Sequence, residues 1–202
     1  MPLIEIEVKF YIKNYEKIIK KIKEYSDKHN ESSLEKNTLF DTKNHFLKKS
    51  NKILRLRTYL GKTILTFKQP SLETSPEFKK LEESEVFVNS FDEMKYILSN
   101  SGFIKTQIYE KQRQIFSKGE LEICVDRLPF GDFIELEGTE NEIKTAVQAL
   151  GFDWNKKILP DYISIFEKIK KENDLLFNDI TFKNFKEVEP KDFSDKILSF
   201  CL

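Results

Sequence analysis

The sequence lacks an excess of charge of either sign. Its 34 lysines and arginines balance its 34 aspartates and glutamates, so the formal net charge at pH 7 is zero. A strongly basic chain would suggest nucleic-acid binding, and a strongly acidic one would suggest a solvating tail. Neither description fits, so we expect no nucleic-acid partner. Any electrostatic function must come from the local placement of charges.

Cysteine is scarce, and long apolar runs are missing. The two cysteines, Cys124 and Cys201, lack the spacing of a metal site and do not suggest a disulfide framework, so a reducing compartment is favoured. No window approaches the roughly 18 to 20 apolar residues that a membrane-spanning helix needs, and the first residues show no signal-peptide pattern. We therefore expect a cytoplasmic protein, monomeric or homodimeric, with no membrane partner.

One pattern of strand and helix occurs three times in a chain long enough for one compact domain. A strand-like run with the sequence Glu-x-Glu begins at Glu5, Glu83 and Glu135, and each is followed by a helix-like run. The second and third helices begin at Ser90 and Thr139, each followed three residues later by glutamate, as in a capping box. These runs predict an α+β fold with many antiparallel strands and a few covering helices. Further strand-like runs lie at 53–59, 62–68, 109–117 and 120–127, with turns expected at Leu60-Gly61 and Lys118-Gly119, and a further helix-like run lies at 160–172.

Charged residues share one face of several predicted strands, because alternate residues of a strand point the same way. An ordinary sheet with a charged face toward water would also show this pattern, and some same-sign pairs arise by chance. Same-sign neighbours repel, however, so three acidic and two basic pairs together favour a sheet that closes with its charged face inward. The residues concerned are Glu5, Glu7 and Lys9, Arg55 and Arg57, Lys68, Glu83 and Glu85, Lys111 and Arg113, Asp126, and Glu135 and Glu137.

An interior lined by both charge signs needs a ligand that satisfies both. Arginine and lysine bind phosphate. Carboxylates would repel the same phosphate unless a hard divalent cation, such as Mg²⁺ or Mn²⁺, lay between them. A triphosphate carries enough negative charge to contact a row of basic residues and a metal ion together. The sequence therefore favours phosphoryl chemistry on a small-molecule triphosphate, with Mg²⁺ or Mn²⁺ as the cofactor.

The order of these motifs resembles that of the CYTH superfamily, the triphosphate tunnel metalloenzymes. The resemblance covers about residues 1–170 and implies a closed antiparallel β-barrel of about eight strands around a tunnel, with helices packed outside. Residues 171–202 have no counterpart, and we expect them to form a C-terminal appendage to this tunnel domain. The matching landmarks are Glu5-Ile-Glu7-Val-Lys9, Leu-Phe-Asp at 39–41, Leu54-Arg-Leu-Arg57, Leu65-Thr-Phe-Lys68, Glu83-x-Glu85, Lys111-x-Arg113, Asp126, 131–137 and Tyr162.

The resemblance also implies roles for individual residues. Lys9, Glu7 and Glu135 are the candidate catalytic residues. The metal ligands would be Glu5, Glu7, Glu135 and Glu137, with Glu83, Glu85 and Asp126 either completing a metal site or orienting basic residues. The triphosphate would be held by Lys9, Arg55, Arg57, Lys68, Lys111 and Arg113.

Two departures from the family pattern lie on the basic side of the tunnel. They leave one phosphate contact unassigned. The first is Leu81, at a position where a basic residue is common; Lys79 and Lys80 are nearby. The second is Pro160-Asp161-Tyr162, which replaces a basic-Ser-Tyr signature. Lys156 or Lys157 could substitute for the basic residue of that signature.

Three functions are compatible with these residues. The first is metal-dependent hydrolysis of thiamine triphosphate or inorganic tripolyphosphate. A class IV adenylate cyclase, which makes cyclic AMP from ATP, would use nearly the same charged shell. Many such cyclases carry a His-Phe pair upstream of the first motif, and its absence before Glu5 favours the hydrolase. The third is a non-catalytic polyphosphate- or nucleotide-binding module, which would need the basic row alone and would leave the six glutamates unexplained.

Overall fold

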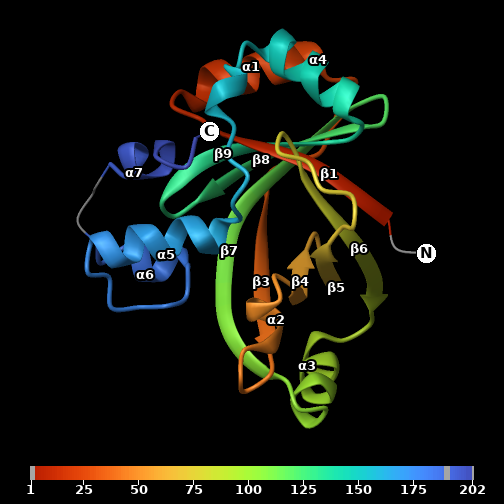
Figure 1. Cartoon of the computed structure of the whole chain (residues 1–202), viewed down its shortest axis with the longest axis vertical. Coiled ribbons are helices and arrows are strands. Elements are labelled where there is room, and N and C mark those ends of the chain that lie inside the picture. The colour runs from red at the N-terminus through yellow and green to blue at the C-terminus, as the bar shows by residue number, and fades with distance from the viewer. Residues whose placement is uncertain (1–2, 189–191, 202) are drawn as a thin grey trace.

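The structure is a computed structural model that describes residues 3–188 and 192–201 (Figure 1). Its described residues form one antiparallel sheet that closes on itself. Along the sheet the order is β7, β3, β4, β5, β6, β1, β9 and β8, and β8 pairs again with β7, while the short β2 adds to the other edge of β7. This is the closed eight-stranded barrel expected from the resemblance. The strands are β1 Leu3–Tyr11, β2 Lys28–His29, β3 Ser33–Asp41, β4 Ile53–Tyr59, β5 Lys62–Pro70, β6 Lys79–Val88, β7 Ile104–Lys118, β8 Leu121–Leu128 and β9 Gly131–Glu137.

Tight turns fix the register of two strand pairs. Leu60 and Gly61 join β4 to β5 with positive φ angles of 49° and 72°, which is the backbone of a two-residue hairpin turn. Between β7 and β8 the turn lies one residue later than expected. Lys118 still pairs with Leu121, so Gly119, with a φ of 58°, begins the turn. Glycine adopts this left-handed backbone without steric cost.

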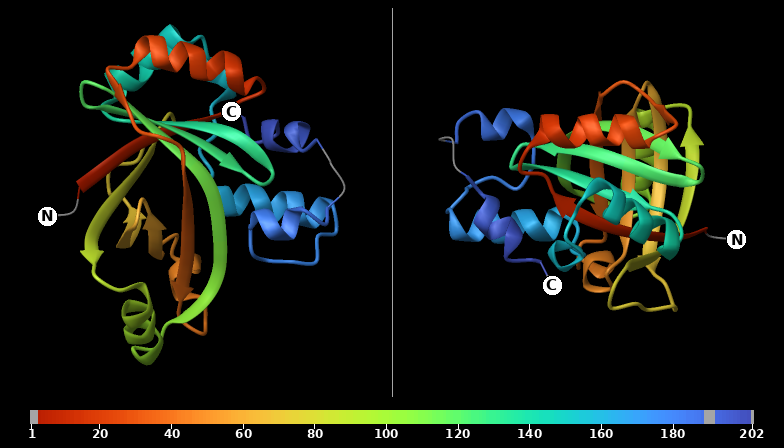
Figure 2. Two further views of the ribbon diagram at one scale, coloured as in Figure 1. Left: turned by 180° about the vertical axis from the view of Figure 1, so that it is seen from behind. Right: turned by 90° about the horizontal axis from the view of Figure 1, so that it is seen from above.

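Two helices cover the outside of β1, β9 and β8 (Figures 1 and 2). They are α1 Tyr15–Tyr25 and α4 Glu140–Leu150, and they contact each other. Helix α4 begins with the expected capping box, in which the Thr139 and Glu142 side chains satisfy each other's backbone amides. Ser90 likewise caps α3 Phe91–Asn100 by accepting from the Glu93 amide.

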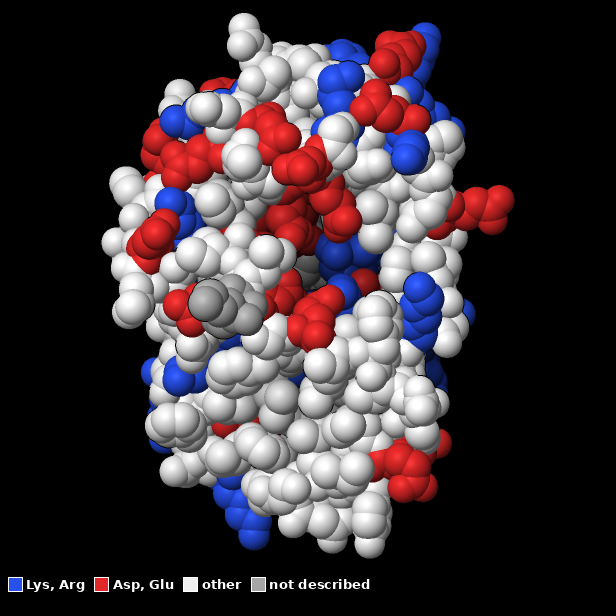
Figure 3. Space-filling model, turned by 90° about the vertical axis from the view of Figure 1, so that its right-hand side faces the viewer, with Lys and Arg blue, Asp and Glu red and all other residues white. Residues whose placement is uncertain are grey.

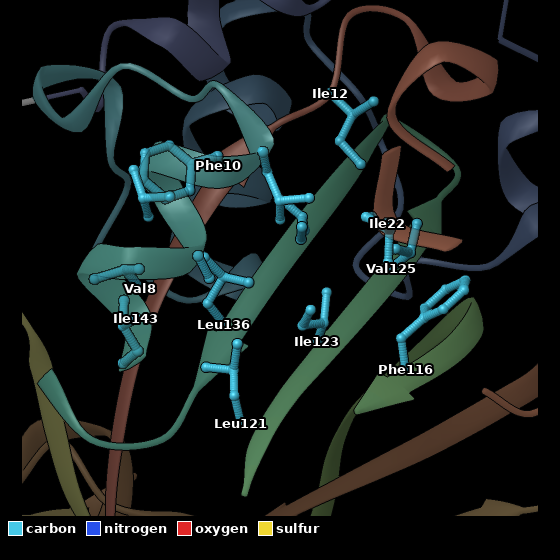
Figure 4. Close-up of a cluster of buried hydrophobic side chains, with 14 of the residues drawn as sticks. Val8, Phe10, Ile12, Ile22, Phe116, Leu121, Ile123, Val125, Leu136 and Ile143 are labelled. Carbon is cyan, nitrogen blue, oxygen red and sulfur yellow. The ribbon is translucent and has the colours of Figure 1, made fainter. Parts of the chain in front are cut away.

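The main apolar core lies between this pair of helices and the barrel wall (Figure 4). Val8, Phe10, Ile123 and Leu136 alternate along their strands with charged residues and are buried against helical residues such as Ile143. The helices therefore take up the apolar face of β1, β8 and β9, and the charged face is left for the inside of the barrel.

A short helix that the sequence pattern did not predict follows β3. Helix α2, Phe46–Lys49, begins where the Asp41 carboxylate accepts the backbone amides of Leu47 and Lys48 at 2.9 Å each. Leu47 packs with the ends of β3 and β4 in a second apolar cluster, which also holds α3. This cluster closes the lower part of the molecule in Figure 1.

The C-terminal residues pack beside β7. Helix α5, Tyr162–Glu172, begins two residues after the expected start because Asp161 caps it by accepting from the Ser164 amide. The helices α6 Phe182–Phe185 and α7 Ser194–Leu198 lie against α5 in an aromatic cluster. The division into a tunnel domain of 1–170 and an appendage of 171–202 stays a prediction. No helix in 3–188 and 192–201 combines the length and apolarity that crossing a bilayer requires.

Candidate active site

The barrel encloses a cavity of about 310 Å³ whose lining is mainly charged. In the space-filling view an opening near the centre has acidic residues around it and basic side chains deeper inside (Figure 3). Every predicted site residue except Asp126 lines this cavity, as the alternation of faces predicted. These residues are Glu5, Glu7, Lys9, Arg55, Arg57, Lys68, Glu83, Glu85, Lys111, Arg113, Glu135 and Glu137.

The strand order gathers most cavity glutamates on one wall of the barrel and the arginines on the wall opposite, with Lys9 and Lys79 among the glutamates. The three strands with Glu-x-Glu, β6, β1 and β9, are neighbours in the sheet, so their glutamates lie side by side. Glu7 of β1, for example, is paired in register with Glu137 of β9. The arginines of β4 and the basic pair of β7 lie on the strands across the barrel. Sheet topology therefore turns three separate sequence motifs into one acidic wall.

Three carboxylates of the acidic wall converge. One oxygen each of Glu5, Glu83 and Glu137 lies within 4.8 Å of the other two. Burial, together with repulsion from Glu5, raises the pKa of Glu137 to about 8. Burial also raises the pKa of Glu83 to about 7, although the nearby Lys68 acts in the opposite direction. Such a carboxylate cluster, which resists full ionisation by itself, is the donor set that a hard divalent cation prefers. We call these three residues the carboxylate trio, and they fit a Mg²⁺ or Mn²⁺ ion.

Two other predicted metal ligands are held by lysines. Glu7 accepts from Lys79 at 2.8 Å, and Glu135 pairs with Lys9 at the same distance. Burial opposes the ionisation of Glu7, but Lys79 and Lys9 outweigh it and lower its pKa to about 2. Burial is likewise outweighed at Glu135, where Lys9 and Lys111 hold the pKa well below its ordinary value. Both side chains are therefore firmly ionised and lie outside the carboxylate trio.

The remaining two predicted acids contact the basic wall. Glu85 accepts from Arg57 at 3.0 Å and from the Thr66 hydroxyl at 2.6 Å. Asp126 is fully buried behind the cavity lining, where it accepts from Lys111 and from the Tyr162 hydroxyl, each at 2.9 Å. For Asp126 this geometry supports the orienting role rather than a direct place at a metal.

One carboxylate that the sequence reasoning missed lies beneath the basic wall. Glu35 of β3 is fully buried, with its oxygens 3.5 Å from Lys111 and 3.6 Å from Arg57. Burial opposes its ionisation, but these cations and Arg113 hold its pKa far below the ordinary value. Asn37, two residues on, donates to it at 3.0 Å. The signal was available in the alternation of β3, just before the Leu-Phe-Asp landmark.

The basic wall retains unused hydrogen-bond donors. Arg55 is buried and donates to the Tyr109 hydroxyl at 3.1 Å, yet its Nε has no hydrogen-bond partner among the described residues. The Nε of Arg57 is in the same condition within the described part of the chain. A buried polar atom without a partner costs free energy, and Glu35 Oε2 and Asn37 Oδ1 beneath the same wall also lack a partner among the described residues. The guanidinium groups of Arg55 and Arg57 line the cavity, so phosphate oxygens bound there would accept from them.

The structure also locates the departures from the family pattern. Lys79, beside Glu7, lines the cavity, whereas Leu81 is buried at the position where a basic residue is common. Lys156 is exposed, and the Lys157 ammonium lies 5.0 Å from the centre of the Trp154 ring. Of the lysines considered, Lys79 is the one that supplies an additional positive charge to the tunnel.

Tyr162 connects the start of α5 to both walls. Its ring lies 4.5 Å from the Lys9 ammonium and 5.3 Å from that of Lys111. Burial, with Asp126 and Glu135, raises the pKa of Tyr162 well above its ordinary value, so the hydroxyl stays a donor to Asp126. The aromatic face thus holds two buried lysines at fixed positions in the tunnel.

Comparison with known proteins agrees with this architecture. The family model described as "CYTH domain" matches residues 3–158. A Methanocaldococcus jannaschii protein provisionally named an adenylate cyclase is 26% identical over 142 residues, which are 70% of this chain and 80% of that protein. A similarly named Vibrio parahaemolyticus structure superposes with a TM-score of 0.69 at 23% identity, covering 83% of this chain and 99% of that one.

A plant structure shares the fold at lower similarity. This Hippeastrum protein, provisionally named an adenylyl cyclase and described as having a dominant triphosphatase activity, gives a TM-score of 0.56 at 18% identity, covering 81% of this chain and 95% of its own. At such identities the structures establish the shared fold, while the family model spans most of the chain. The chain therefore belongs to the CYTH domain family.

Proposed function

We propose that this protein hydrolyses a small-molecule triphosphate, such as thiamine triphosphate or inorganic tripolyphosphate, in a reaction that depends on Mg²⁺ or Mn²⁺. The observation that carries the proposal is one cavity inside the barrel that holds both the carboxylate trio and arginines whose Nε atoms have no hydrogen-bond partner among the described residues. A metal ion alone would explain the carboxylates but not the arginines, and a phosphate chain alone would explain the arginines but not the carboxylates. A phosphate chain that contacts the arginines and shares a cation with the carboxylates satisfies both.

Glu5, Glu83 and Glu137 would hold the metal ion, since one oxygen of each lies within 4.8 Å of the other two. A Mg²⁺ or Mn²⁺ ion bound there would neutralise the carboxylates and withdraw electron density from a phosphoryl oxygen. The trio lies on three adjacent strands, so its spacing is fixed by the barrel rather than by a loop. Rigid ligands of this kind favour an ion of defined size.

The basic wall would bind the phosphates and stabilise the charge that develops on them. Arg55, Arg57, Lys111 and Arg113 already have their positions fixed by buried acids and a tyrosine hydroxyl. Donors that are fixed before the reaction need no reorganisation in the transition state, which is where electrostatic stabilisation is largest. Anchoring by buried acids therefore prepares this wall for phosphoryl transfer.

Glu7, Glu135 and Lys9 would act at the reacting phosphate. Both glutamates are ionised and remain hydrogen-bond acceptors, so they can orient a water molecule toward the terminal phosphorus. The water oxygen bonds to that phosphorus as the bond from the phosphorus to the bridging oxygen breaks. The diphosphate leaves on the bridging oxygen, and the protons of the water stay on orthophosphate or pass to solvent. The buried ammonium of Lys9, 2.8 Å from Glu135, would offset the charge of the departing oxygens.

An adenylate cyclase is the second candidate, because the three similar proteins named above carry a cyclase name provisionally. A cyclase would use the same walls but would displace pyrophosphate from the first phosphorus of ATP. The Hippeastrum protein, which is described as having a dominant triphosphatase activity despite its cyclase name, favours the hydrolase. A non-catalytic polyphosphate- or nucleotide-binding module is a third reading, and it leaves the carboxylate trio without a purpose.

A phosphate-release panel tests the proposal. Thiamine triphosphate, tripolyphosphate and ATP are each supplied with Mg²⁺, Mn²⁺ or EDTA, and cyclic AMP is measured in parallel. We expect metal-dependent orthophosphate release that Glu137→Gln reduces at least a hundredfold. Glu120→Gln, in the exposed β7–β8 turn, is the matched control and should keep its activity. Cyclic AMP as the main product would replace the hydrolase with the cyclase, and no turnover of any substrate would leave the binding module.

A further inference from the structure

The first half of β7 has an edge that β8 does not reach. Strand β3 pairs with β7 from Ile104 to Arg113, whereas the pairing of β7 with β8 runs only from Gln112 to Lys118. An open strand edge presents backbone amide and carbonyl groups that need partners. The barrel is therefore incomplete along this edge unless another part of the chain covers it.

Residues 178–181, between α5 and α6, cover this edge. Ile180 forms a parallel bridge with Tyr109. The Ile180 amide donates to the Ile108 carbonyl, and the Ile180 carbonyl accepts from the Glu110 amide, each at 2.8 Å. In Figure 1, α5 and α6 accordingly lie beside β7 on the left of the barrel. We call residues 178–181 the edge segment.

Side chains hold the edge segment on both sides. The Asp179 carboxylate accepts from the Ile108 amide at 2.8 Å, and the Asn178 carbonyl accepts from the Gln107 side chain at 2.6 Å. On the side away from β7, the Asn184 side chain of α6 donates to the Asp179 carbonyl at 2.8 Å. The edge segment thus has a fixed position on the outside of β7.

Tyr109 connects this edge to the basic wall. It is buried and lines the charged cavity, and its hydroxyl accepts from Nη1 of Arg55 at 3.1 Å. Arg55 also donates to the Thr66 hydroxyl at 3.5 Å, and its distances to Glu85 and Glu83 are 3.7 and 3.9 Å. The contact with Tyr109 is the shortest of these, so the position of Arg55 depends most on the tyrosine.

The other basic residues of β7 are anchored differently. Asp126 accepts from Lys111 at 2.9 Å and from Nε of Arg113 at 2.6 Å, inside the barrel. A displacement of the edge segment would therefore move Tyr109 and Arg55, while Lys111 and Arg113 would keep their buried partner. This difference makes a role of the edge segment at Arg55 separable from a general effect on the wall.

We propose that the edge segment positions Arg55 through Tyr109, so that the C-terminal part of the chain completes the basic wall. Asp179 and Tyr109 are then positioning residues, and Arg55 is the group that contacts phosphate. That last assignment rests on the proposed function, whereas the coupling to Arg55 does not. The edge segment lies beyond residues 3–158, which the family model matches, so the family resemblance does not account for this role.

Substitutions on both sides of the contact test this role. Asp179→Ala removes the acceptor of the Ile108 amide, whereas Asp179→Asn keeps an acceptor oxygen and is the conservative rescue. Gln107→Ala loosens the edge segment independently, from β7. Tyr109→Phe removes the hydroxyl and leaves the backbone bridge. Glu187→Ala, which changes an exposed acid of the same C-terminal part, is the matched control.

Two measurements are made on each variant after circular dichroism has verified its fold. The dissociation constant of tripolyphosphate is measured by calorimetry in EDTA. Nitrogen NMR follows the Nε–H signal of Arg55 without ligand, and the loss of this signal in Arg55→Lys assigns it. The NMR signal reports the surroundings of Arg55 directly and requires no binding or turnover.

We expect Asp179→Ala and Gln107→Ala each to shift the Arg55 signal and to weaken tripolyphosphate binding about threefold to tenfold. Tyr109→Phe should weaken it about tenfold, the effect of losing one hydrogen bond to a charged group. Combining Asp179→Ala with Tyr109→Phe should add little to Tyr109→Phe alone, because both act through the same hydroxyl. Asp179→Asn and the control should stay within about twofold of the wild type.

Additive losses in the double variant, or an Arg55 signal that Asp179→Ala and Gln107→Ala leave unchanged, would overturn the proposal. Equal losses in Asp179→Asn and Asp179→Ala would also overturn it, since the acceptor oxygen would then have no part. A wild type that does not bind tripolyphosphate, with an Arg55 signal that still responds as expected, would contradict the proposed function alone and leave the positioning role in place.

Discussion

Lys68 of β5 lies directly opposite Glu83 of β6, and its ammonium is 3.1 Å from the Glu83 carboxylate. The same ammonium contacts Glu5, so one lysine bridges two members of the carboxylate trio. Burial opposes the charged form of Lys68, but Glu5 and other carboxylates keep its pKa above the ordinary value. Lys68 is therefore the cation that compensates the trio within the protein itself, and a metal ion would compete with it.

Lys68→Met is expected to separate metal binding from triphosphate binding. Removing the ammonium removes a competitor and a repelling charge, so Mn²⁺ should bind the free protein three- to tenfold more tightly. Tripolyphosphate should bind at least tenfold more weakly, because a phosphate contact is lost. Electron paramagnetic resonance of Mn²⁺ and calorimetry measure the two affinities. Lys80→Met, an outward lysine paired with Glu140, is the control. Weaker Mn²⁺ binding in Lys68→Met would contradict the competition.

The pH dependence of stability should report on the same cluster. The folded protein raises the pKa of Glu83 to about 7 and that of Glu137 to about 8, both from an ordinary value of 4.5. The stability that their protonated forms contribute is present below pH 4.5 and is lost as pH rises through 8. Glu7, whose pKa is lowered to about 2, acts in the opposite direction and only below pH 4.5.

Thermal unfolding without metal should therefore show a Tm that falls between pH 5 and pH 9, and Glu137→Gln should flatten this slope. Mg²⁺ should restore the Tm at pH 9 by roughly 5 to 10 °C at a hundredfold excess over its Kd, because it binds only the folded, deprotonated cluster. The exposed-turn variant Glu120→Gln serves as the control. A Tm that does not change with pH in the absence of metal would mean that basic residues such as Lys68 fully neutralise the charge of the carboxylate trio.

The charged lining was the part of the site most accessible from sequence. Alternation along a strand decides which face a side chain takes, and it does so independently of how the sheet closes. Glu5, Glu7 and Lys9 could thus be assigned to one face from β1 alone, and the order of motifs supplied the barrel. Which carboxylates meet could not be obtained this way, because Glu5, Glu83 and Glu137 converge through the curvature of three strands.

Three site residues were not predicted from the sequence, because their roles also depend on how distant strands pair. Glu35 stands beside Lys36 and Asn37, and the next acidic residue of β3 with the same parity is Asp41, so no i, i+2 pair of like charge marked it. Lys79 begins β6, and its face was ambiguous until the register placed it opposite Glu7. Tyr109 became a partner of Arg55 only when β7 and β4 were brought to either side of β3. Each of these roles depends on contacts between distant strands.

Glu35→Gln should weaken the fold in a way that substrate repairs. The substitution leaves Arg57 without its buried counter-charge, while Lys111 and Arg113 keep Asp126, and we expect it to cost about 3 kcal/mol of stability. Tripolyphosphate supplies the missing negative charge, so it should raise the Tm of the variant more than that of the wild type. Thermal unfolding with and without tripolyphosphate measures this difference, and the exposed Glu31→Gln is the control. An equal ligand-induced shift in both proteins would mean that Glu35 does not position the basic wall.

The identity of the products should reveal which phosphate lies at the carboxylate trio. If the carboxylate trio of Glu5, Glu83 and Glu137 holds the metal ion, the phosphate chain of ATP runs along the basic wall and its terminal phosphate lies at the trio. Water then attacks the terminal phosphorus, and the bond to the bridging oxygen breaks, so the products are ADP and orthophosphate. Phosphorus NMR of the reaction in ¹⁸O-labelled water distinguishes this outcome, since the label enters orthophosphate alone. Glu83→Gln should slow the reaction at least a hundredfold without changing the products, because it removes a metal ligand but leaves the orientation of the phosphate chain unchanged. Pyrophosphate together with AMP or cyclic AMP would mean that the first phosphate, and not the terminal one, lies at the trio.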